Sequence, residues 1–238
     1  MATVILVRHG RSTANVEGIL AGRAEGVDLD EVGRRQAERA AERLAAVPLV
    51  AVVSSPLARC RQTAGIIAEH QAQTVPMQLE PGIVETDYGQ WQGRLVKELA
   101  QEPLWSVVQS RPSAAVFPGG ESLAAMQARS VEAIRRHDAA LEAEHGAEAV
   151  WVAVSHGDII ATVLGDALGM DLDLYQRLTV TTGSVSIVRY GSTRPQVVAT
   201  NTDSGDLSWL RGQAPVGDAQ LGGAAHPGTA AQGADLVK

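Results

Sequence analysis

Residues 3–10 read Thr-Val-Ile-Leu-Val-Arg-His-Gly, a short apolar run that ends in two basic residues and a glycine. Two later stretches share this design: Leu49–Val53 leads into Ser54-Ser55-Pro56, and Ala149–Val154 leads into Ser155-His156-Gly157. Short runs of Val, Ile and Leu that are apolar on both faces are typical of the buried strands of a parallel sheet. The sequence therefore predicts a parallel sheet whose strands end in polar residues.

Helical patterns separate these runs. Asp28 and Glu31 predict a capping box for one helix, and Ser55 predicts an N-cap for the next, with Pro56 as its first residue. The small or apolar residues expected on the buried faces of these two helices are Ala37, Ala40, Ala41, Leu44, Cys60, Ala64 and Ile67. Strands that alternate with helices favour an α/β fold, and we expect a three-layer α/β/α sandwich with a mostly parallel central sheet.

The domain organisation follows from the same patterns. Ser184–Tyr190 and Gln196–Thr200 predict two late strands, an antiparallel pair at one edge of the sheet. We expect a single domain over residues 1–210, in which the irregular, proline-containing stretch 88–120 is an inserted excursion that covers the site. Residues 211–238 are rich in Ala, Gly and Gln, a composition that predicts a disordered tail.

Composition excludes several classes of protein. The 238 residues carry a formal net charge of -7 without a stripe of Lys and Arg, so nucleic acid is not expected as a partner. No apolar stretch approaches the roughly 18–20 residues of a membrane span, and no signal peptide is recognisable at the N-terminus. Cys60 is the only cysteine, which excludes an intrachain disulfide and an all-Cys zinc site. We expect a cytoplasmic protein without membrane contact.

The polar residues that follow the strands indicate a binding site. Ligands of open α/β sheets bind beyond the carboxyl ends of the strands, so Arg8, His9 and His156 are expected at one edge. Arg59 lies in the first turn of its helix, and helical side chains lean towards the helix N-terminus, which directs its guanidinium to the same edge. The helix after Gly157 adds backbone N–H groups and a positive dipole end. This set favours a tetrahedral anion such as a phosphoryl group.

Each of these residues also has an ordinary structural interpretation. A single histidine is most often structural or exposed, Arg59 could be a solvated helix residue, and Ser155-His156-Gly157 could be a tight strand-to-helix turn. Together these interpretations weaken, because a polar cluster at three strand ends is unfavourable unless it binds something. Cys60 projects from a different face of the helix than Arg59 and is interpreted as a core residue.

Arg8–Asn15 resembles the RHG-x-[ST]-x-x-N signature of the histidine phosphatase superfamily, whose fold is phosphoglycerate-mutase-like. Glu85–Gly93 resembles the acid-residue segment of that family, E-x-x-[YF]-G-x-W-x-G. Four more segments agree in order, namely Leu29–Ala37, Ser54–Ala64, Pro118–Ser122 and Ser155–Gly157. The RHG triplet alone is a weak signal, but the ordered set, which spans roughly residues 4–200, is a strong one.

The resemblance implies a metal-independent phosphohydrolase without a cofactor, in which His9 takes up the phosphoryl group as a phosphohistidine. His9 must attack as the neutral imidazole, a form that neighbouring positive charge favours. Glu85 is implied to protonate the leaving oxygen, which requires a raised pKa or a mildly acidic optimum; Asp87 is the competing candidate. The residues implied to bind the substrate are Arg8, Ser12, Asn15, Ala21, Gly22, Arg59, His156 and Gly157.

Three alternatives stay open. A mutase would return the phosphoryl group to a second hydroxyl of its substrate, but the segment after Glu85 lacks the Arg-His pair typical of phosphoglycerate mutases, and Arg111 has no neighbouring arginine. A metallohydrolase would use His9, His156 and Glu85 as ligands, but no paired-histidine metal motif is present. A non-catalytic binder would not need all the catalytic positions, which are intact. The sequence therefore favours a phosphatase.

The sequence does not define the leaving group. We expect a small phosphorylated metabolite, such as a sugar or glycerate phosphate, a nucleotide-derived monoester or a phosphoamino acid. Arg11, Gln90, Trp91 and the stretch up to Phe117 are expected to shape that choice. The family often forms dimers, so a homodimer is a possible assembly that nothing in the sequence tests.

Overall fold

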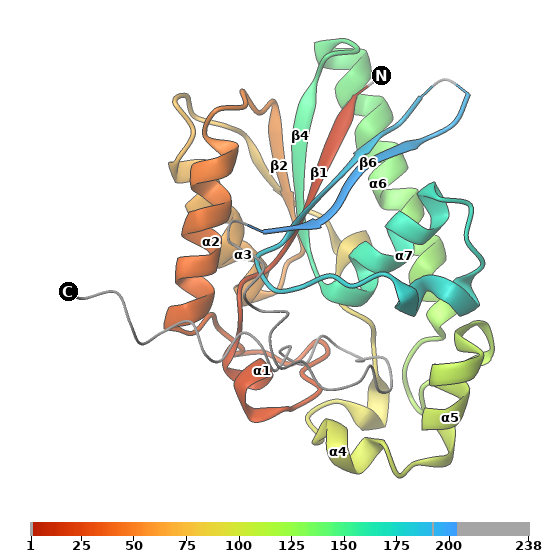
Figure 1. The fold of residues 1–238 in the computed structure, drawn as a ribbon. Helices are drawn as coiled ribbons and strands as arrows, with labels where there is room; N and C mark the ends of the chain where they lie inside the picture. The colour runs from red at the N-terminus through yellow and green to blue at the C-terminus, as the bar shows by residue number, and fades with distance from the viewer. Residues whose placement is uncertain (1, 192, 204–238) are drawn as a thin grey trace.

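The computed structural model describes residues 2–191 and 193–203, so the tail predicted for residues 211–238 lies outside the described residues. Strands form one sheet in the order β3-β2-β4-β1-β5-β6 (Figure 1). The strands are β1 (Thr3–Arg8), β2 (Ala51–Ser54), β3 (Met77–Leu79), β4 (Val150–Ser155), β5 (Val185–Arg189) and β6 (Gln196–Thr202).

The sheet is parallel on one side and antiparallel on the other. Strands β3, β2, β4 and β1 run parallel to one another, whereas β5 is antiparallel to β1 and β6 is antiparallel to β5. Every residue of β2 is buried, as are all but the first residues of β1 and β4, which strands covered on both faces require. The expected mixed, mostly parallel α/β sheet is confirmed.

Helices cover both faces of the sheet (Figure 1). Ile5 and Val7 of β1 point to one face, and Val4 and Leu6 point to the other, because side chains alternate along a strand. The helices are α2 (Glu31–Leu44) and α3 (Ala58–Glu69) on the first face, with α6 (Leu123–His145) and α7 (Gly157–Ala167) on the second. The α/β/α layers expected from the sequence are therefore present.

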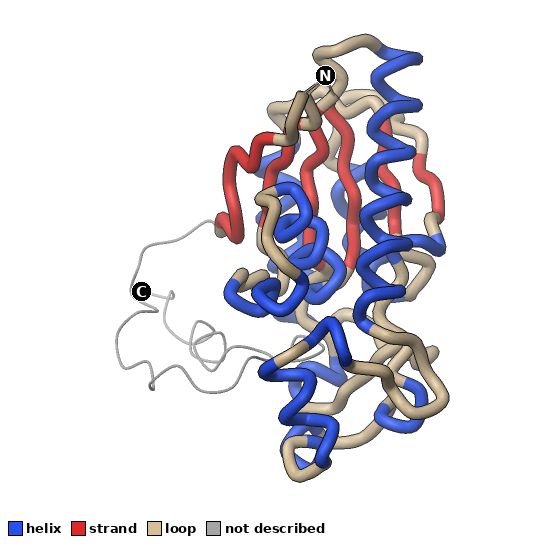
Figure 2. Tube along the Cα trace, turned by 90° about the vertical axis from the view of Figure 1, so that its right-hand side faces the viewer, coloured by secondary structure: helices blue, strands red, loops and turns tan. Residues whose placement is uncertain are grey.

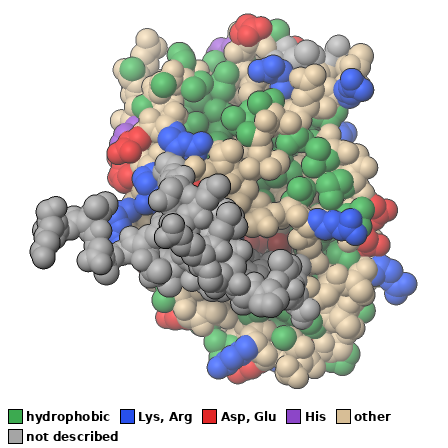
Figure 3. Space-filling view, in the orientation of Figure 1, with side chains coloured by type: hydrophobic (Ala, Val, Ile, Leu, Met, Phe, Trp, Pro, Cys, Tyr) green, Lys and Arg blue, Asp and Glu red, His purple; other side chains and the backbone are tan. Residues whose placement is uncertain are grey.

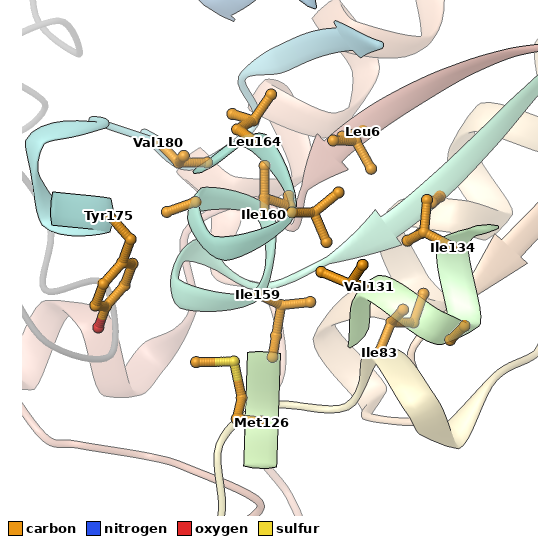
Figure 4. Close-up of a cluster of buried hydrophobic side chains, with 14 of the residues drawn as sticks. Leu6, Ile83, Met126, Val131, Ile134, Ile159, Ile160, Leu164, Tyr175 and Val180 are labelled. Atoms are coloured by element: carbon orange, nitrogen blue, oxygen red, sulfur yellow. The ribbon is translucent and has the colours of Figure 1, made fainter. Parts of the chain in front are cut away.

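The core between the sheet, α6 and α7 also holds the loop that precedes Glu85. Figure 4 shows Leu6 of β1, Ile134 of α6 and Ile160 of α7 in one cluster with Ile83. All four side chains are at most 1% exposed. Burial of a Leu or Ile side chain stabilises a fold by roughly 1.5–3 kcal/mol. Ile83 therefore fixes the chain two residues before Glu85 against the core.

The remaining segments gather at the carboxyl ends of the parallel strands, a separation that Figure 2 shows from the side. They are α1 (Thr13–Glu17), α4 (Val96–Leu99), α5 (Pro103–Ser110) and the 3-10 turns Pro81–Ile83, Gly89–Trp91 and Pro112–Ala114; a further turn, Leu172–Arg177, follows α7. Within the stretch 88–120, the rings of Tyr88, Trp91, Trp105 and Phe117 pack on one another. This aromatic cluster is continuous with the core that contains Leu6 and Ile83, so the stretch is packed onto the rest of the fold.

Two helix starts differ from the sequence prediction. The N-cap of α2 is Asp30, whose carboxylate accepts from the Gly33 N–H at 2.7 Å, and not Asp28. Helix α3 begins only at Ala58, without a side-chain cap. The Ser55 hydroxyl lies 2.8 Å from Nε2 of His156 and accepts only a long hydrogen bond, of 3.5 Å, from the Leu57 N–H. Strand β3 was not predicted, since its short run is exposed throughout and carries no buried pattern.

The surface charges are dispersed. On the described part of the face seen in Figure 3, Lys and Arg side chains form no continuous stripe, and hydrophobic and other groups lie between them. The absence of a nucleic-acid partner stays a prediction from the composition.

Candidate active site

The register of the two central strands brings the two histidines together. Arg8 is paired with Ser155, and the His9 N–H donates to the Ser155 carbonyl at 3.0 Å. His9 and His156 each follow their strand directly, and their ring centroids lie 5.2 Å apart at an interplanar angle of 64°. Both side chains are at most 3% exposed. Two segments almost 150 positions apart in sequence thus form one site.

Arg59 joins these two imidazoles. Its Nε donates to Nε2 of His9 at 3.3 Å, and its Nη2 lies 3.3 Å from Nδ1 of His156. Nη2 also donates to the Gly22 carbonyl at 2.8 Å. Nη1 of Arg59 is buried and has no hydrogen-bond partner within the described residues. A buried N–H of a cation without an acceptor is unfavourable, and a phosphoryl oxygen is the kind of group that would satisfy it.

His9 is held as a neutral base. Nδ1 lies 2.7 Å from the Gly10 carbonyl, which can only accept, so the proton sits on Nδ1. Nε2 faces the Arg59 donor and therefore carries the lone pair. Burial, followed by the charges of Arg59 and Arg8, holds the pKa of His9 well below its usual value. The result is the neutral imidazole that a nucleophile requires.

Arg8 places a second guanidinium at the strand ends. Its Nη1 donates to the Val180 carbonyl at 2.5 Å. A Cβ atom on Gly157 would lie 3.4 Å from the guanidinium carbon of Arg8, so the cation packs on the backbone at the start of α7. The N-terminus of α7 and the guanidinium of Arg8, both expected at this edge of the sheet, thus lie in contact at Gly157.

Glu85 enters the site from the loop after Ile83. The side chain is 2% exposed; its Oε1 accepts from the Thr86 N–H at 2.9 Å, and its Oε2 lies 3.8 Å from Nδ1 of His156. Burial, together with the charge of Asp158, raises the pKa of Glu85 to about 7. A carboxyl group with this pKa carries a proton through much of the neutral range and can donate it.

Asp87, the competing acid, lies in a different environment. Its side chain is 39% exposed and its Oδ2 is 3.6 Å from Nη1 of Arg23. Its Oδ1 accepts from the Gly89 N–H at 3.0 Å, which stabilises the turn that follows. The buried position beside His156 therefore favours Glu85 over Asp87 as the acid.

A network of ion pairs holds the backbone of Glu85. The Glu85 carbonyl accepts from Nε of Arg23 at 2.8 Å and from Nη2 of Arg129 at 3.2 Å. Both arginines also bind Oε1 of Glu121, at 2.9 and 2.6 Å, and this oxygen accepts from the Asp87 N–H at 2.8 Å. We call Arg23, Asp87, Glu121 and Arg129 the Glu121 network. It positions Glu85 without touching its carboxyl group.

The other expected substrate residues are arranged around a short helix and a loop. Ser12 is the N-cap of α1, and its hydroxyl and N–H both donate to Oδ1 of Asn15. Gly22 lies in the left-handed region, with φ of +53°, and its carbonyl binds Arg59. Within the part of the chain that the structure describes, no hydrogen bond joins Ser12 or Ala21 to the histidines. We call Arg8, His9, Arg59, Glu85 and His156 the strand-end cluster, since their side chains are those brought together.

The described residues contain neither a metal-binding cluster nor a helix that could cross a membrane. Within residues 2–191 and 193–203, no group of three or more His, Cys, Asp or Glu side chains could hold a metal ion. Arg59 lies against both imidazoles, where its charge would repel a cation. In the same part of the chain, no helix is both long and apolar enough to span a bilayer.

Comparison with known proteins decides the family. A family model for the histidine phosphatase superfamily (branch 1) matches residues 4–203 of the chain. The chain belongs to this superfamily. The match confirms the resemblance inferred from the ordered motifs.

Relatives within the histidine phosphatase superfamily include phosphatases and mutases. Phosphoserine phosphatase 1 of Hydrogenobacter thermophilus is 32% identical over 207 residues, which cover 84% of this chain and 92% of the relative. The probable phosphoglycerate mutase GpmB of Proteus mirabilis is 33% identical over 198 residues, which cover 80% of this chain and 86% of the relative. The structure of a mycobacterial glucosyl-3-phosphoglycerate phosphatase in complex with VO3 aligns with a TM-score of 0.74 at 27% identity, covering 84% of this chain and 99% of that one. These similarities confirm the phosphoglycerate-mutase-like fold.

Several polar residues of this histidine phosphatase superfamily member escaped the sequence reasoning. The Ser55 hydroxyl lies 2.8 Å from Nε2 of His156, and the Thr63 hydroxyl accepts from the Gly10 N–H at 3.2 Å. The hydroxyl of Tyr88 donates to Asp158 at 2.6 Å, and both are buried. All of these residues lie in or beside the quoted motifs, so their position within a motif could have identified them. Their residue types alone indicated helix caps, turns and core residues.

Proposed function

We propose that this protein hydrolyses phosphate monoesters of small metabolites through a phosphohistidine on Nε2 of His9. The observation that carries the proposal is the geometry of this nitrogen, which lies 3.3 Å from Nε of Arg59 in a buried site that also contains Glu85, whose pKa is raised to about 7. A nucleophile, a cationic anchor and a proton donor are the three groups that monoester cleavage requires.

The reaction proceeds in two balanced steps. In the first, Nε2 of His9 forms a bond to phosphorus while the bond from phosphorus to the ester oxygen breaks, and the Glu85 carboxyl gives its proton to that oxygen. In the second, the Glu85 carboxylate takes a proton from water, whose oxygen attacks phosphorus while the bond to Nε2 breaks. Inorganic phosphate leaves, and both residues return to their starting forms. Covalent catalysis thus divides one very slow reaction into two faster ones.

The cations act on the charge of the phosphoryl group. Arg8 and Arg59 are buried beside His9, where the low local dielectric strengthens their attraction for the equatorial oxygens. Removal of one preorganised donor of this kind lowers kcat by roughly 10²–10³-fold in other enzymes. We assign phosphoryl binding to Arg8, Arg59, His156 and the backbone at Gly157, and substrate contacts to Ser12, Asn15, Ala21 and Gly22.

Trapping of the intermediate tests the proposal. Acid-labile, base-stable phosphate should appear on the protein within one turnover of a radiolabelled aryl phosphate, and mass spectrometry should place it on His9. His9→Ala should give no labelled protein and at least about 10⁴-fold lower turnover, while its circular dichroism spectrum is unchanged. Undiminished turnover in His9→Ala would overturn the mechanism.

A phosphoglycerate mutase is the second candidate, because one relative with 33% identity carries that name. A mutase must return the phosphoryl group to a second hydroxyl before the product leaves, whereas the segment Glu85–Gly89 lacks the Arg-His pair and Arg111 has no neighbouring arginine. NMR of a reaction with 3-phosphoglycerate separates the two functions. Glycerate and free phosphate are expected, and 2-phosphoglycerate would identify a mutase.

The substrate belongs to the class of small phosphorylated metabolites. Phosphoserine and glucosyl-3-phosphoglycerate are the first compounds to test, since the names of two relatives contain them. A panel ranked by kcat/KM, with sugar phosphates and nucleotide-derived monoesters included, identifies the preferred leaving group. We further propose that residues 1–210 act as one domain in the cytoplasm and that the stretch 88–120 covers the site. A homodimer stays a prediction for sedimentation to test.

A further inference from the structure

The proposed reaction does not use the contact between Ser55 and His156. The Ser55 hydroxyl lies 2.8 Å from Nε2 of His156, and both side chains are fully buried. Ser55 stands at the end of β2, whereas His156 follows β4, the neighbouring strand. Its hydroxyl accepts from the Leu57 N–H at 3.5 Å but does not cap α3. A buried serine that contacts an imidazole across two strands is therefore a candidate for a role in the reaction.

Arg59 decides which nitrogen of His156 carries the proton. A guanidinium has only donors, and Nη2 of Arg59 lies 3.3 Å from Nδ1 of His156. Nδ1 must therefore accept, so the proton of the neutral imidazole is on Nε2. Burial and then the charge of Arg59 hold the pKa of His156 well below its usual value, which makes the neutral ring the form to consider. The Nε2–H then donates to Oγ of Ser55.

The two histidines are thus held in opposite tautomers. His9 carries its proton on Nδ1, bound to the Gly10 carbonyl, and His156 carries its proton on Nε2, bound to Ser55. Arg59 faces the unprotonated nitrogen of each ring. The charged or titratable groups around His156 are Arg8, His9, Arg59, Cys60, Glu85 and Arg129.

We propose that Ser55 is a positioning residue that keeps the proton of His156 on Nε2 and so reserves Nδ1 for the phosphoryl group. This inference rests on the proposed function. A phosphoryl monoanion bound at His9 can then share its P–O–H proton with Nδ1. If that proton moves along the hydrogen bond, the products are an imidazolium and a phosphoryl dianion, and no proton is taken from solvent.

Cys60 cannot replace Ser55 in this role. Its sulfur lies 3.5 Å from Nε2 of His156, but a thiol is a weak hydrogen-bond acceptor. Burial raises the pKa of the Cys60 thiol to about 12, so no thiolate is available to hold the proton. Without the serine hydroxyl, the Nε2–H would be buried against sulfur, and the preference for this tautomer would be reduced.

Nitrogen NMR of histidine-labelled protein tests the tautomer directly. Protonated and unprotonated ring nitrogens resonate in separate regions, and a His156→Gln variant assigns the signals. In the free wild-type protein we expect a protonated Nε2 and an unprotonated Nδ1 for His156, and with inorganic phosphate a protonated Nδ1. Ser55→Ala should show a mixture of tautomers. A free protein with the proton on Nδ1, or an unaltered Ser55→Ala spectrum, would overturn the proposal.

Kinetics then separate positioning from folding. Ser55→Ala should lower kcat/KM by roughly tenfold to hundredfold and weaken inhibition by inorganic phosphate to a similar extent, because a hydrogen bond to a group that becomes charged is lost. Ser55→Thr, which keeps the hydroxyl, should restore most of the phosphate affinity. Ser54→Ala is the matched control, since the Ser54 hydroxyl is equally buried but donates to the Ser55 carbonyl at 2.8 Å. Equal losses in Ser54→Ala and Ser55→Ala would refute a role specific to Ser55.

The outcomes also distinguish this inference from the proposed function. If wild-type protein forms no phosphohistidine, the proposed function fails whatever the tautomer of His156. If wild-type protein is phosphorylated on His9 and Ser55→Ala matches it in phosphate inhibition and kcat/KM, only the role of Ser55 fails. Activity is normalised to the amount of folded protein, measured by circular dichroism, so a partly unfolded variant does not imitate either result.

Discussion

Two groups of arginine contacts meet at Glu85 and differ in what balances the charge of the arginine. Arg59, in the strand-end cluster, contacts two neutral imidazoles and a backbone carbonyl and forms no ion pair within the described residues. Arg129, in the Glu121 network, binds both oxygens of Glu121 and the carbonyls of Gly82, Val84 and Glu85. One arginine keeps its charge available, and the other has it neutralised.

This difference separates a binding site from its support. An uncompensated buried cation is unfavourable in the free protein, and the same charge attracts an incoming phosphoryl group. A cation such as Arg129, which is paired with a carboxylate and binds several backbone carbonyls, has little attraction left for a phosphoryl group. It holds the backbone in place instead. Glu85, the proposed acid, connects the two groups: its carboxyl group lies in the strand-end cluster, and its carbonyl oxygen is bound by the Glu121 network.

The same truncation in each group gives the largest expected contrast. Arg59→Ala should lower kcat/KM by about 10³-fold or more, since loss of an arginine that stabilises a transferring phosphoryl group costs about 10³–10⁵ in rate elsewhere. Arg129→Ala should instead lower the free energy of unfolding by about 1–3 kcal/mol, with a smaller loss of activity per folded molecule. Thermal unfolding and kcat/KM for an aryl phosphate, measured on both variants, provide the comparison.

Arg136→Ala serves as the control for this pair. Arg136 binds Glu80 at 2.7 Å, but its side chain is 57% exposed, so its removal should alter both quantities little. Equal losses of activity in Arg59→Ala and Arg129→Ala would contradict the division between a binding site and its support.

The sequence was sufficient for the sheet and for most of the strand-end cluster. Each central strand is a continuous apolar run, so burial on both faces is visible in the sequence, and the polar residues at its end must lie at one edge of a parallel sheet. This reasoning placed His9, His156 and Arg59 together, and the motif match added Glu85. All four side chains are buried within one cluster.

The sequence was not sufficient for local hydrogen bonds. Asp28 and Asp30 are both good caps, and only the folded backbone shows that Asp30 reaches the Gly33 N–H. Ser55 has the type and position of an N-cap, yet its hydroxyl binds a histidine 101 residues away. The Glu121 network joins residues from three separate segments, each of which reads alone as an ordinary surface charge. Contacts between distant polar residues leave no periodic signal.

Replacement of the acid probes the carboxyl group of Glu85. Glu85→Gln should lower kcat by about 10²–10⁴-fold for alkyl phosphates, and far less for p-nitrophenyl phosphate, whose leaving group needs no proton. Wild-type activity on alkyl phosphates should fall as pH rises through about 7, because Glu85 loses its proton there. The variant should lack this decline. Initial rates over a pH series for both substrates measure the effect.

Asp87→Asn is the matched control for the acid. Asp87 is the second carboxylate of the same segment, but its side chain is 39% exposed and lies next to Arg23. The decline near pH 7 should persist in this variant. If the decline in activity near pH 7 disappeared in Asp87→Asn and persisted in Glu85→Gln, Asp87 would be the proton donor.

The raised pKa of Glu85 also affects stability. The folded protein holds the Glu85 proton up to about pH 7, whereas the unfolded chain releases it near 4.5, so stability is lost as pH rises between these values. The loss corresponds to about 3 kcal/mol at most above pH 7. Glu85→Gln, which keeps an acceptor for the Thr86 N–H and cannot ionise, should have a Tm that rises relative to wild type between pH 5 and pH 8. A constant difference in Tm would contradict a buried, protonated Glu85.

The smallest expected effect has the opposite sign and comes from the Glu121 network. Burial alone would raise the pKa of Glu121, but hydrogen bonds from Arg129 and from the Asp87 N–H outweigh it and lower the pKa. Because its pKa is lowered, Glu121 stabilises the fold when the pH is above the pKa of this group in the unfolded chain. This stabilisation is lost as the pH falls through the pKa of Glu121 in the folded protein. Because the group is half-buried, we expect a loss of only about 1 kcal/mol in Glu121→Gln at pH 7, read from urea unfolding, with the difference from wild type shrinking below pH 4. The charge of Glu85 thus opposes folding at high pH, whereas the charge of Glu121 favours it. If the difference in unfolding free energy between wild type and Glu121→Gln grew as the pH fell, Glu121 would not be the supporting charge that this division assigns to it.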